Sequence, residues 1–157
     1  TVFMKFDKSI PLEELLKSFR FRKSVETRWS DMDEMHHINN AVYLTYFEQA
    51  RVYYFHEACQ WDWKNDGAIL ASANINYIVP LRFPEAAYIY VRTARLGTKS
   101  IDLEYAIVRE NEDGSQTLMN VGNTTMVAFD YKTQKSIPLP EYIKERLLAY
   151  EPMLKDN

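Results

Sequence analysis

The sequence predicts an α+β fold in which a curved antiparallel sheet of about five strands wraps around one long, buried helix. Segment 41–57 carries apolar side chains around most of its helical circumference, which is typical of a helix in a protein core. The second half of the chain alternates apolar and polar residues in four segments separated by short turns, which favour antiparallel neighbours. Because the apolar surface of the helix must be buried and the sheet has one apolar face, we expect the sheet to wrap around the helix.

Length and composition fit a single domain over residues 1–157. The chain is 46% hydrophobic and 14% aromatic, which excludes a disordered protein. With 19 Lys and Arg against 22 Asp and Glu, the net charge is −3, so no nucleic acid partner is indicated. No apolar run approaches the roughly 18 residues of a membrane span, so no membrane insertion is expected. A single cysteine, Cys59, and the absence of a signal peptide favour a cytoplasmic location.

The first 40 residues predict a short helix, a strand and a polar loop. Ser9 is a suitable N-cap for an amphipathic helix. The apolar positions of that helix are Leu12, Leu15, Leu16 and Phe19. Residues 25–29 alternate apolar and polar side chains, which predicts a half-buried strand. The loop at 30–40 leads into helix 41–57, for which Asn39 or Asn40 is the expected N-cap.

The central helix has one apolar row and one carboxylate that needs a partner. The row consists of Leu44, Phe47, Ala50 and Tyr54. Aromatic residues lower helix propensity, so tertiary packing must stabilise this helix. Burial of the Glu48 carboxylate on such a helix would cost free energy unless the carboxylate is paired. It forms either a structural ion pair with Arg51, three residues further on, or a second acid or base facing a substrate pocket.

Four strands and a final helix complete the predicted chain. The strands are expected at 69–79, 88–96, 101–107 and 117–130, with a hairpin loop at 111–114 and a helix at 139–150. A sheet of this kind leaves its edge strands unpaired, a liability that partner subunits often resolve. We therefore expect a homodimer or a homotetramer.

The loop before the central helix holds the side chains that acyl chemistry needs. It contains two carboxylates, Asp31 and Asp33, and two imidazoles, His36 and His37. It runs directly into a helix N-terminus, which presents free N–H groups and the positive end of the helix dipole. One such donor to a developing oxyanion is worth about 2.7–4 kcal/mol of barrier in enzymes. A carboxylate, an imidazole and an oxyanion hole together support acyl transfer to water.

The loop also resembles a family signature. It reads Trp29-Ser30-Asp31-Met32-Asp33, followed by His37-Ile38-Asn39-Asn40 and Tyr43. This pattern resembles the stretch D-x-D-x-x-G-H-V-N-N-x-x-Y of hotdog-fold acyl-CoA thioesterases, in the 4-hydroxybenzoyl-CoA thioesterase-like group. Plant acyl-ACP thioesterases carry a similar stretch. The predicted order of one strand, a helix and four strands is also the hotdog order, so the resemblance implies a hotdog fold.

The resemblance assigns catalytic roles to three positions. Asp33 matches the catalytic carboxylate, which acts either as nucleophile or as base. His37 matches the histidine of the pattern, and it either orients the substrate or only builds the loop. Asn40 matches the second asparagine, and the backbone N–H near it would be the oxyanion donor. The chain departs from the pattern at His36, where many bacterial members have Gly, and at Met35, where the plant enzymes have Asn.

Substrate contacts are expected from Asn39, Tyr43, Glu48 and Lys99. Lys99 matches a lysine that touches the CoA phosphates in a relative. The basic residues beside that lysine in the relative are replaced by Gly97 and Thr98 in this chain. Asp31 is expected to be a structural carboxylate, which hydrogen-bonds the backbone of its own turn, and not a catalytic one. Adjacent histidines point in different directions and no third ligand follows at metal spacing, so neither a metal nor a redox cofactor is expected.

We therefore expect a hydrolase of fatty acid metabolism that cleaves the thioester of an acyl-CoA or an acyl-ACP. Two alternatives stay open. A non-catalytic hotdog protein would bind acyl-CoA in the same pocket without cleaving it. A hotdog dehydratase would remove water from a 3-hydroxyacyl thioester, with His37 and Asp33 as its acid and base.

Overall fold

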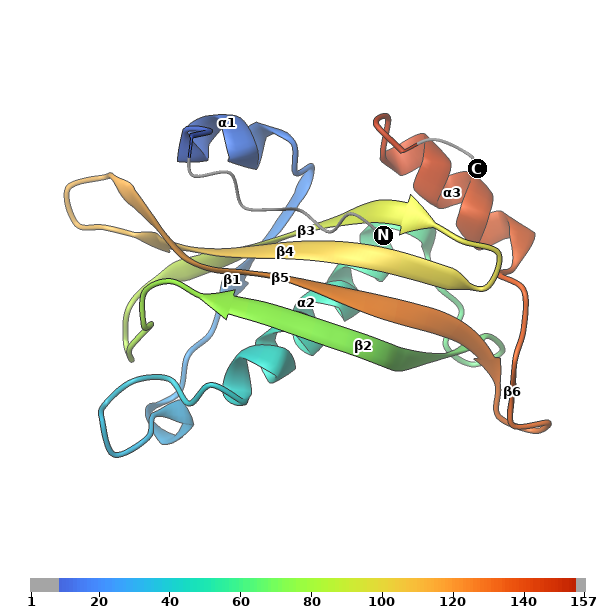
Figure 1. Ribbon diagram of the computed structural model, residues 1–157, viewed down its shortest axis with the longest axis horizontal. Helices are drawn as coiled ribbons and strands as arrows, with labels where there is room; N and C mark the ends of the chain where they lie inside the picture. The colour runs from blue at the N-terminus through green and yellow to red at the C-terminus, as the bar shows by residue number, and fades with distance from the viewer. Residues whose placement is uncertain (1–8, 155–157) are drawn as a thin grey trace.

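One long helix lies against the inner face of an antiparallel sheet, as predicted (Figure 1). The computed structural model describes residues 9–154. None of the helices in that range is long and apolar enough to cross a bilayer. In chain order the elements are α1 (Leu12–Lys17), β1 (Phe21–Val25), a 3-10 turn (Trp29–Asp31), α2 (Val42–Cys59), β2 (Gly67–Tyr77), β3 (Ala87–Leu96), β4 (Ser100–Glu110), β5 (Gln116–Asp130), β6 (Lys135–Ser136) and α3 (Glu141–Tyr150).

The sheet has the order β1-β3-β4-β5-β2, and β6 pairs with β5. All of its strand pairs are antiparallel. β3, β4 and β5 are sequential neighbours joined by short turns, as predicted. The prediction is wrong for β2, which pairs with β5 and not with β3. The longer connection at 78–86 carries the chain across the end of the sheet, so β2 becomes an edge strand.

The first strand lies earlier in the chain than the alternation at 25–29 predicts. β1 ends at Val25, and Trp29 enters the 3-10 turn with 72% of its surface exposed. The reason is local: the backbone N–H of Arg28 donates to the carboxylate of Asp31 (2.9 Å), so it is not free for a strand ladder.

The inner face of the sheet packs against one side of α2. The ring of Phe47 stacks on Tyr105 of β4, with centroids 4.2 Å apart and an interplanar angle of 4°. Gly122 of β5 permits this approach, because a Cβ there would lie 2.4 Å from the Phe47 ring. Ile143 and Leu147 of α3 are fully buried in the same core. Each such side chain contributes about 1.5–3 kcal/mol of burial, which holds an aromatic helix of modest propensity in place.

Helix α1 packs on the outer face of the sheet (Figure 1). Neighbouring residues of β4 point to opposite faces, so Tyr105 faces α2 while Ala106 contacts the cluster around Leu16 of α1. The helix begins at Leu12, with Pro11 at the N-cap position in place of the predicted Ser9.

One side of α2 and the edge strand β2 stay exposed. The prediction that α2 is mostly buried is wrong for this side, because the sheet covers only part of the helix. Large apolar side chains that are 38–49% exposed here are Leu44, Val52 and Tyr53 on α2, and Ile69, Leu70 and Tyr77 on β2. The chain therefore presents an apolar helix face and an unpaired strand edge to its surroundings.

Candidate active site

Asp31 anchors the loop between β1 and α2. Its side chain is 3% exposed and accepts hydrogen bonds from the Tyr46 hydroxyl (2.7 Å) and from the Arg28 guanidinium (3.0 Å). Burial alone raises the pKa of this carboxyl, but the hydrogen bonds from Tyr46 and Arg28 outweigh burial and hold the pKa below its ordinary value. The hypothesis that Asp31 is a loop carboxylate bonded to nearby backbone is confirmed by its bond to the Arg28 N–H.

Asp33 has one oxygen that builds the loop and one that is unengaged. Its Oδ1 accepts hydrogen bonds from the N–H of Met35 (2.9 Å) and of His37 (3.4 Å). Its own N–H donates to the His37 carbonyl (2.8 Å), which closes a tight turn. Within residues 9–154, Oδ2 makes no hydrogen bond, and the residue is exposed. Asp33 is therefore fixed in place and still offers one carboxylate oxygen to a reactant.

His36 lies inside that turn in a backbone conformation that glycine favours. Its φ is 58°, in the left-handed region. This is the position at which many members of the resembled family have Gly. A side chain in this conformation carries a steric cost that glycine would not.

The two asparagines at the start of α2 have different environments. Asn39 is held at both ends: its N–H donates to the Asp31 carbonyl (2.9 Å), and its Oδ1 accepts from the Ala41 N–H (2.9 Å). The N-cap position of α2 is Ala41, so the prediction of Asn39 or Asn40 as the cap is wrong, and the Asn39 side chain, two residues before the cap position, bonds the backbone of Ala41 itself. The N–H of Asn40 has no hydrogen-bond partner in the described part of the chain. It is a free donor at the positive end of an 18-residue helix.

These residues meet at one cavity of about 370 Å³. Of the seven predicted site residues, Asp33, His37, Asn40 and Tyr43 line it. The remaining lining residues are Met35, Ile38, Tyr77, Ile78, Val79 and Pro80. A cavity of this volume suits a small-molecule ligand, and its wall combines apolar side chains with the polar groups of Asp33, His37 and Asn40.

Three predicted substrate contacts lie outside this cavity. Asn39 is used in the turn described above. Glu48 is exposed on α2 and pairs with the buried Arg51 (3.4 Å), as in the ion-pair hypothesis. Lys99 lies at the opposite end of the sheet, with its Nζ near Ser136 Oγ (3.4 Å). The β4 residue next to it pairs with residue 127 of β5, whereas Tyr77 pairs with residue 120, so about 23 Å of strand separates Lys99 from the cavity.

A cation that the sequence analysis did not identify contacts the site histidine. The guanidinium of Arg82 lies 3.1 Å from Nε2 of His37. Because arginine only donates, Nε2 must accept, and the imidazole proton therefore lies on Nδ1. The two residues are 45 positions apart in the sequence, and no spacing pattern connects them.

The segment after β2 is bonded to the loop and to the start of α2. The Leu81 N–H donates to the Tyr43 hydroxyl (2.9 Å), and the Leu81 carbonyl accepts from the Ile38 N–H (2.8 Å). The Tyr77 hydroxyl donates to the carbonyl of Asn40 (2.8 Å). Tyr77 lies within the strand predicted at 69–79, and no pattern in the sequence indicates a role for it in the site. These contacts hold the cavity wall and the helix start as one unit.

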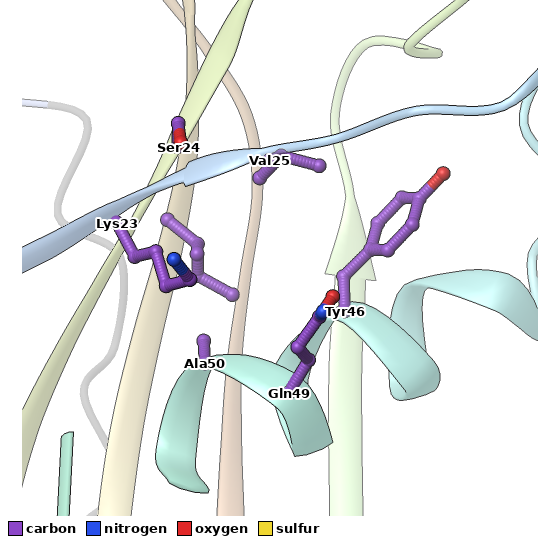
Figure 2. Close-up of a pocket in the computed structure, with 7 residues that line it drawn as sticks. Lys23, Ser24, Val25, Tyr46, Gln49 and Ala50 are labelled. Carbon is purple, nitrogen blue, oxygen red and sulfur yellow. The ribbon is translucent and has the colours of Figure 1, made fainter. Parts of the chain in front are cut away.

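A second gap, between β1 and α2, is too small for a substrate. Figure 2 shows it, lined by Lys23, Ser24 and Val25 of β1 and by Tyr46, Gln49 and Ala50 of α2. Its volume is about 10 Å³, which is room for at most about one water molecule. The hydroxyl of Tyr46 points away from the gap and reaches Asp31 instead (Figure 2).

Comparisons with known proteins identify the family of this chain. A profile of the thioesterase-like superfamily matches residues 27–147. The long-chain acyl-CoA thioesterase FadM of Escherichia coli (strain K12) is 30% identical over 134 residues, which cover 83% of this chain and 97% of FadM.

Solved structures of thioesterases are also similar to this chain. A thioesterase of Thermus thermophilus, crystallised with coenzyme A and Zn, is 30% identical with a TM-score of 0.74, and the match covers 87% of this chain and 97% of that one. The 4-hydroxybenzoyl-CoA thioesterase of Pseudomonas sp. strain CBS-3 has a TM-score of 0.73 at 16% identity, covering 80% of this chain and 97% of that one. The latter likeness concerns the fold alone. The predicted hotdog fold is confirmed.

Proposed function

Because the chain belongs to the thioesterase-like superfamily, we propose that it hydrolyses the thioester bond of an acyl-CoA to a free acid and coenzyme A. One observation carries this proposal: the carboxylate of Asp33, with its unengaged oxygen, and the residue with the free helix N–H, Asn40, line the same cavity. That pairing supplies an activating carboxylate and an oxyanion donor, the two groups that acyl transfer to water requires.

The thioester carbonyl oxygen would accept a hydrogen bond from the Asn40 N–H. When a nucleophile adds to the carbonyl carbon, this oxygen becomes negative and the donor holds it more strongly than it holds the ground state. Collapse of the tetrahedral intermediate breaks the carbon–sulfur bond and expels the coenzyme A thiolate. A thiolate is a good leaving group, so the reaction needs little general-acid assistance.

Asp33 acts by one of two routes. As a general base, it takes a proton from water while the oxygen of that water adds to the carbonyl carbon. As a nucleophile, its carboxylate oxygen adds directly and displaces the thiolate, and water then hydrolyses the resulting acyl anhydride. Single turnover in H₂¹⁸O separates the routes, because attack by water at the Asp33 carbonyl of the anhydride leaves one ¹⁸O in the protein.

His37 fits the role of an orienting group better than that of a base. Its Nε2 accepts from Arg82, so the ring presents the Nδ1 proton as a donor. We assign it to the positioning of the thioester or of the attacking water, next to Asp33 in the cavity wall.

The exposed edge of β2 supports a homodimer. Its unpaired backbone groups can bond a partner strand, and the exposed apolar side chains of β2 and of the open side of α2 offer apolar contacts. If two copies pair through this edge about a two-fold axis, the strands run antiparallel and the Gly67 end of one meets the Tyr77 end of the other. The acyl chain would then lie in an apolar pocket between subunits.

The same pairing gives Lys99 a route to a substrate. The turn that carries Lys99 lies near the Gly67 end of β2, since Phe129 pairs with both Gly67 and Ser136. Lys99 of the partner subunit would therefore lie near the Tyr77 end of β2, beside the cavity. Its charge suits a phosphate.

A substrate panel tests the proposal. Purified protein is incubated with acyl-CoAs of different chain lengths, with matched acyl-ACPs and with a 3-hydroxyacyl-CoA, while a thiol reporter and mass spectrometry follow the products. We expect thiol release from acyl-CoA. Binding of acyl-CoA without thiol release would favour the non-catalytic alternative, and loss of water without thiol release would favour the dehydratase.

A further inference from the structure

The hydroxyl of Tyr77 reaches the backbone peptide that follows the proposed oxyanion donor. Tyr77 is the last residue of β2, and its hydroxyl donates to the carbonyl oxygen of Asn40 across 2.8 Å. The two residues come from different elements and are 37 positions apart. Both line the cavity, so this hydrogen bond is formed at the surface that faces the substrate.

The helix itself makes no use of that carbonyl. In a regular α-helix the N–H of Leu44 would donate to the carbonyl of Asn40, four residues earlier. Here the Leu44 N–H donates to Ala41 instead (3.2 Å), in a tighter turn. Within the described part of the chain, Tyr77 is thus the partner that holds the Asn40 carbonyl.

The neighbouring peptide groups are fixed by other contacts. The N–H of Asn39 is bonded to the Asp31 carbonyl, and the N–H of Ala41 is bonded to the Asn39 side chain. Between them, Asn40 has a free N–H and a carbonyl held by a side chain from the opposite wall of the cavity. The peptide that carries the free N–H is held at its other end, where the Asn39 carbonyl accepts from the Val42 N–H (2.9 Å). The Tyr77 hydrogen bond holds the next peptide and thereby restrains the ψ angle of Asn40, so it acts on the orientation of the free N–H across the Asn40 Cα.

The Tyr77 ring is itself held in position. It packs edge-to-face against the Tyr43 ring, with centroids 5.4 Å apart, and the Tyr43 hydroxyl accepts from the N–H of Leu81. The Tyr77 side chain thus connects the edge strand to the start of α2 through two contacts, the packing of its ring on Tyr43 and the hydrogen bond of its hydroxyl. This distinguishes it from a surface tyrosine that meets a carbonyl by chance.

We propose that Tyr77 is a positioning residue of the thioesterase reaction, which aims the Asn40 N–H at the thioester oxygen by holding the Asn40 carbonyl. The inference rests on the proposed function, because it needs an oxyanion at Asn40. Tyr77 donates no proton in the reaction, and it acts through the backbone alone. Small misplacements of a catalytic group reduce rates by up to about 100-fold, so the effect of its hydroxyl is measurable.

The test compares Tyr77→Phe with Tyr142→Phe. Tyr77→Phe removes one hydroxyl and keeps the ring that packs on Tyr43. Tyr142→Phe removes a hydroxyl of α3 that donates to Asp66 (2.6 Å), at the opposite end of β2 from Tyr77 within the chain. We expect Tyr77→Phe to lower kcat about 10-fold with KM within twofold of wild type and an unchanged thermal midpoint. Tyr142→Phe should keep the wild-type kcat.

Two inhibitors add a readout that a purely structural role would not move. A trifluoromethyl ketone analogue of acyl-CoA forms an oxyanion when a nucleophile adds to it, whereas a thioether analogue forms none. Tyr77→Phe should lower the affinity for the ketone analogue about 10-fold, in line with the fall in kcat, and leave the affinity for the thioether analogue unchanged. Equal weakening of both inhibitors would overturn the inference.

The amide signal of Asn40 separates this inference from the proposed function. Hydrogen exchange and the ¹⁵N chemical shift of that N–H should change in Tyr77→Phe and stay unchanged in Tyr142→Phe. If wild-type protein hydrolyses no thioester, the proposed function fails and the positioning role fails with it, whatever the amide signal does. If wild type is active and Tyr77→Phe retains its full kcat, the positioning role alone fails.

Discussion

The guanidinium of Arg82 donates a hydrogen bond to Nε2 of His37 across 3.1 Å, from the segment that follows β2 to the loop that precedes α2. The contact fixes the imidazole plane beside Asp33 and places its proton on Nδ1. His37 lines the cavity, so a histidine that is held in this way can offer its Nδ1 proton to a ligand, which agrees with a role in orienting the substrate.

Removal of Arg82 should therefore release His37. In Arg82→Ala the ring loses its donor, so we expect the Nδ1-protonated form to be mixed with the other tautomer. Long-range ¹⁵N–¹H NMR of the imidazole reads the tautomer directly. The kcat should fall about 10-fold, which is less than the roughly 100-fold at the low end for a group that itself transfers a proton, because Arg82 acts only through His37. An unchanged tautomer in the variant would show that Arg82 does not set it.

Asp31 should stabilise the fold in a pH-dependent way. Its folded-state pKa lies below the unfolded value, so its contribution is full above the ordinary carboxyl pKa and is lost as pH falls through the folded value. Asp31→Asn should lower the free energy of unfolding at pH 7 by about 2 kcal/mol, since hydrogen bonds to a charged group are lost. Urea titrations at several pH values should also show that the unfolding free energy of the variant falls less than that of wild type as the pH drops below the ordinary carboxyl pKa.

His36 should be replaceable by glycine with a gain in stability. A side chain at φ 58° costs about 1–3 kcal/mol, whereas glycine adopts this region freely. After the entropy that glycine loses on folding, we expect His36→Gly to be more stable by roughly 0.5–1 kcal/mol. His56→Gly, inside α2, should be less stable by about the same amount. Urea unfolding measures both, and destabilisation by His36→Gly would contradict the reading of this turn.

The edge of β2 should carry the subunit contact. Wild-type protein should sediment at twice the 18.6 kDa mass of the chain. Leu70→Lys places a charge on this edge, where the side chain is 44% exposed, and should shift the protein to a monomer with lower kcat. Met153→Lys, at a position 89% exposed near the end of the described chain, should stay dimeric and active. A fully active wild-type monomer would contradict the proposed dimer.

Much of the fold follows from local patterns in the sequence. The spacing of apolar residues locates α2, and the period-two segments locate β3, β4 and β5, because these signals depend only on neighbouring residues. The position of β2 beside β5 depends on a crossing at 78–86, which no local pattern encodes. The false strand at 25–29 arises because a side chain of the loop, Asp31, takes a backbone donor that a strand would use.

The site was predictable where its residues are contiguous. Asp33, His37 and Asn40 lie within eight positions of one another and line one cavity. Arg82 and Tyr77 join them only through the tertiary fold, so no spacing in the sequence identifies them. Glu48 shows the reverse: its partner Arg51 is three residues away, and the ion pair follows from helix geometry.

Hydrolysis of acyl-CoA by Asp33→Asn tests the central claim most directly. Asparagine keeps the size of the side chain and an oxygen for the Met35 and His37 N–H groups, but it removes the charge that activates water or attacks the carbonyl. We expect kcat to fall at least about 100-fold, with the thermal midpoint and the binding of a thioether analogue close to wild type. A folded Asp33→Asn protein that turns over acyl-CoA at nearly the wild-type rate would contradict the assignment.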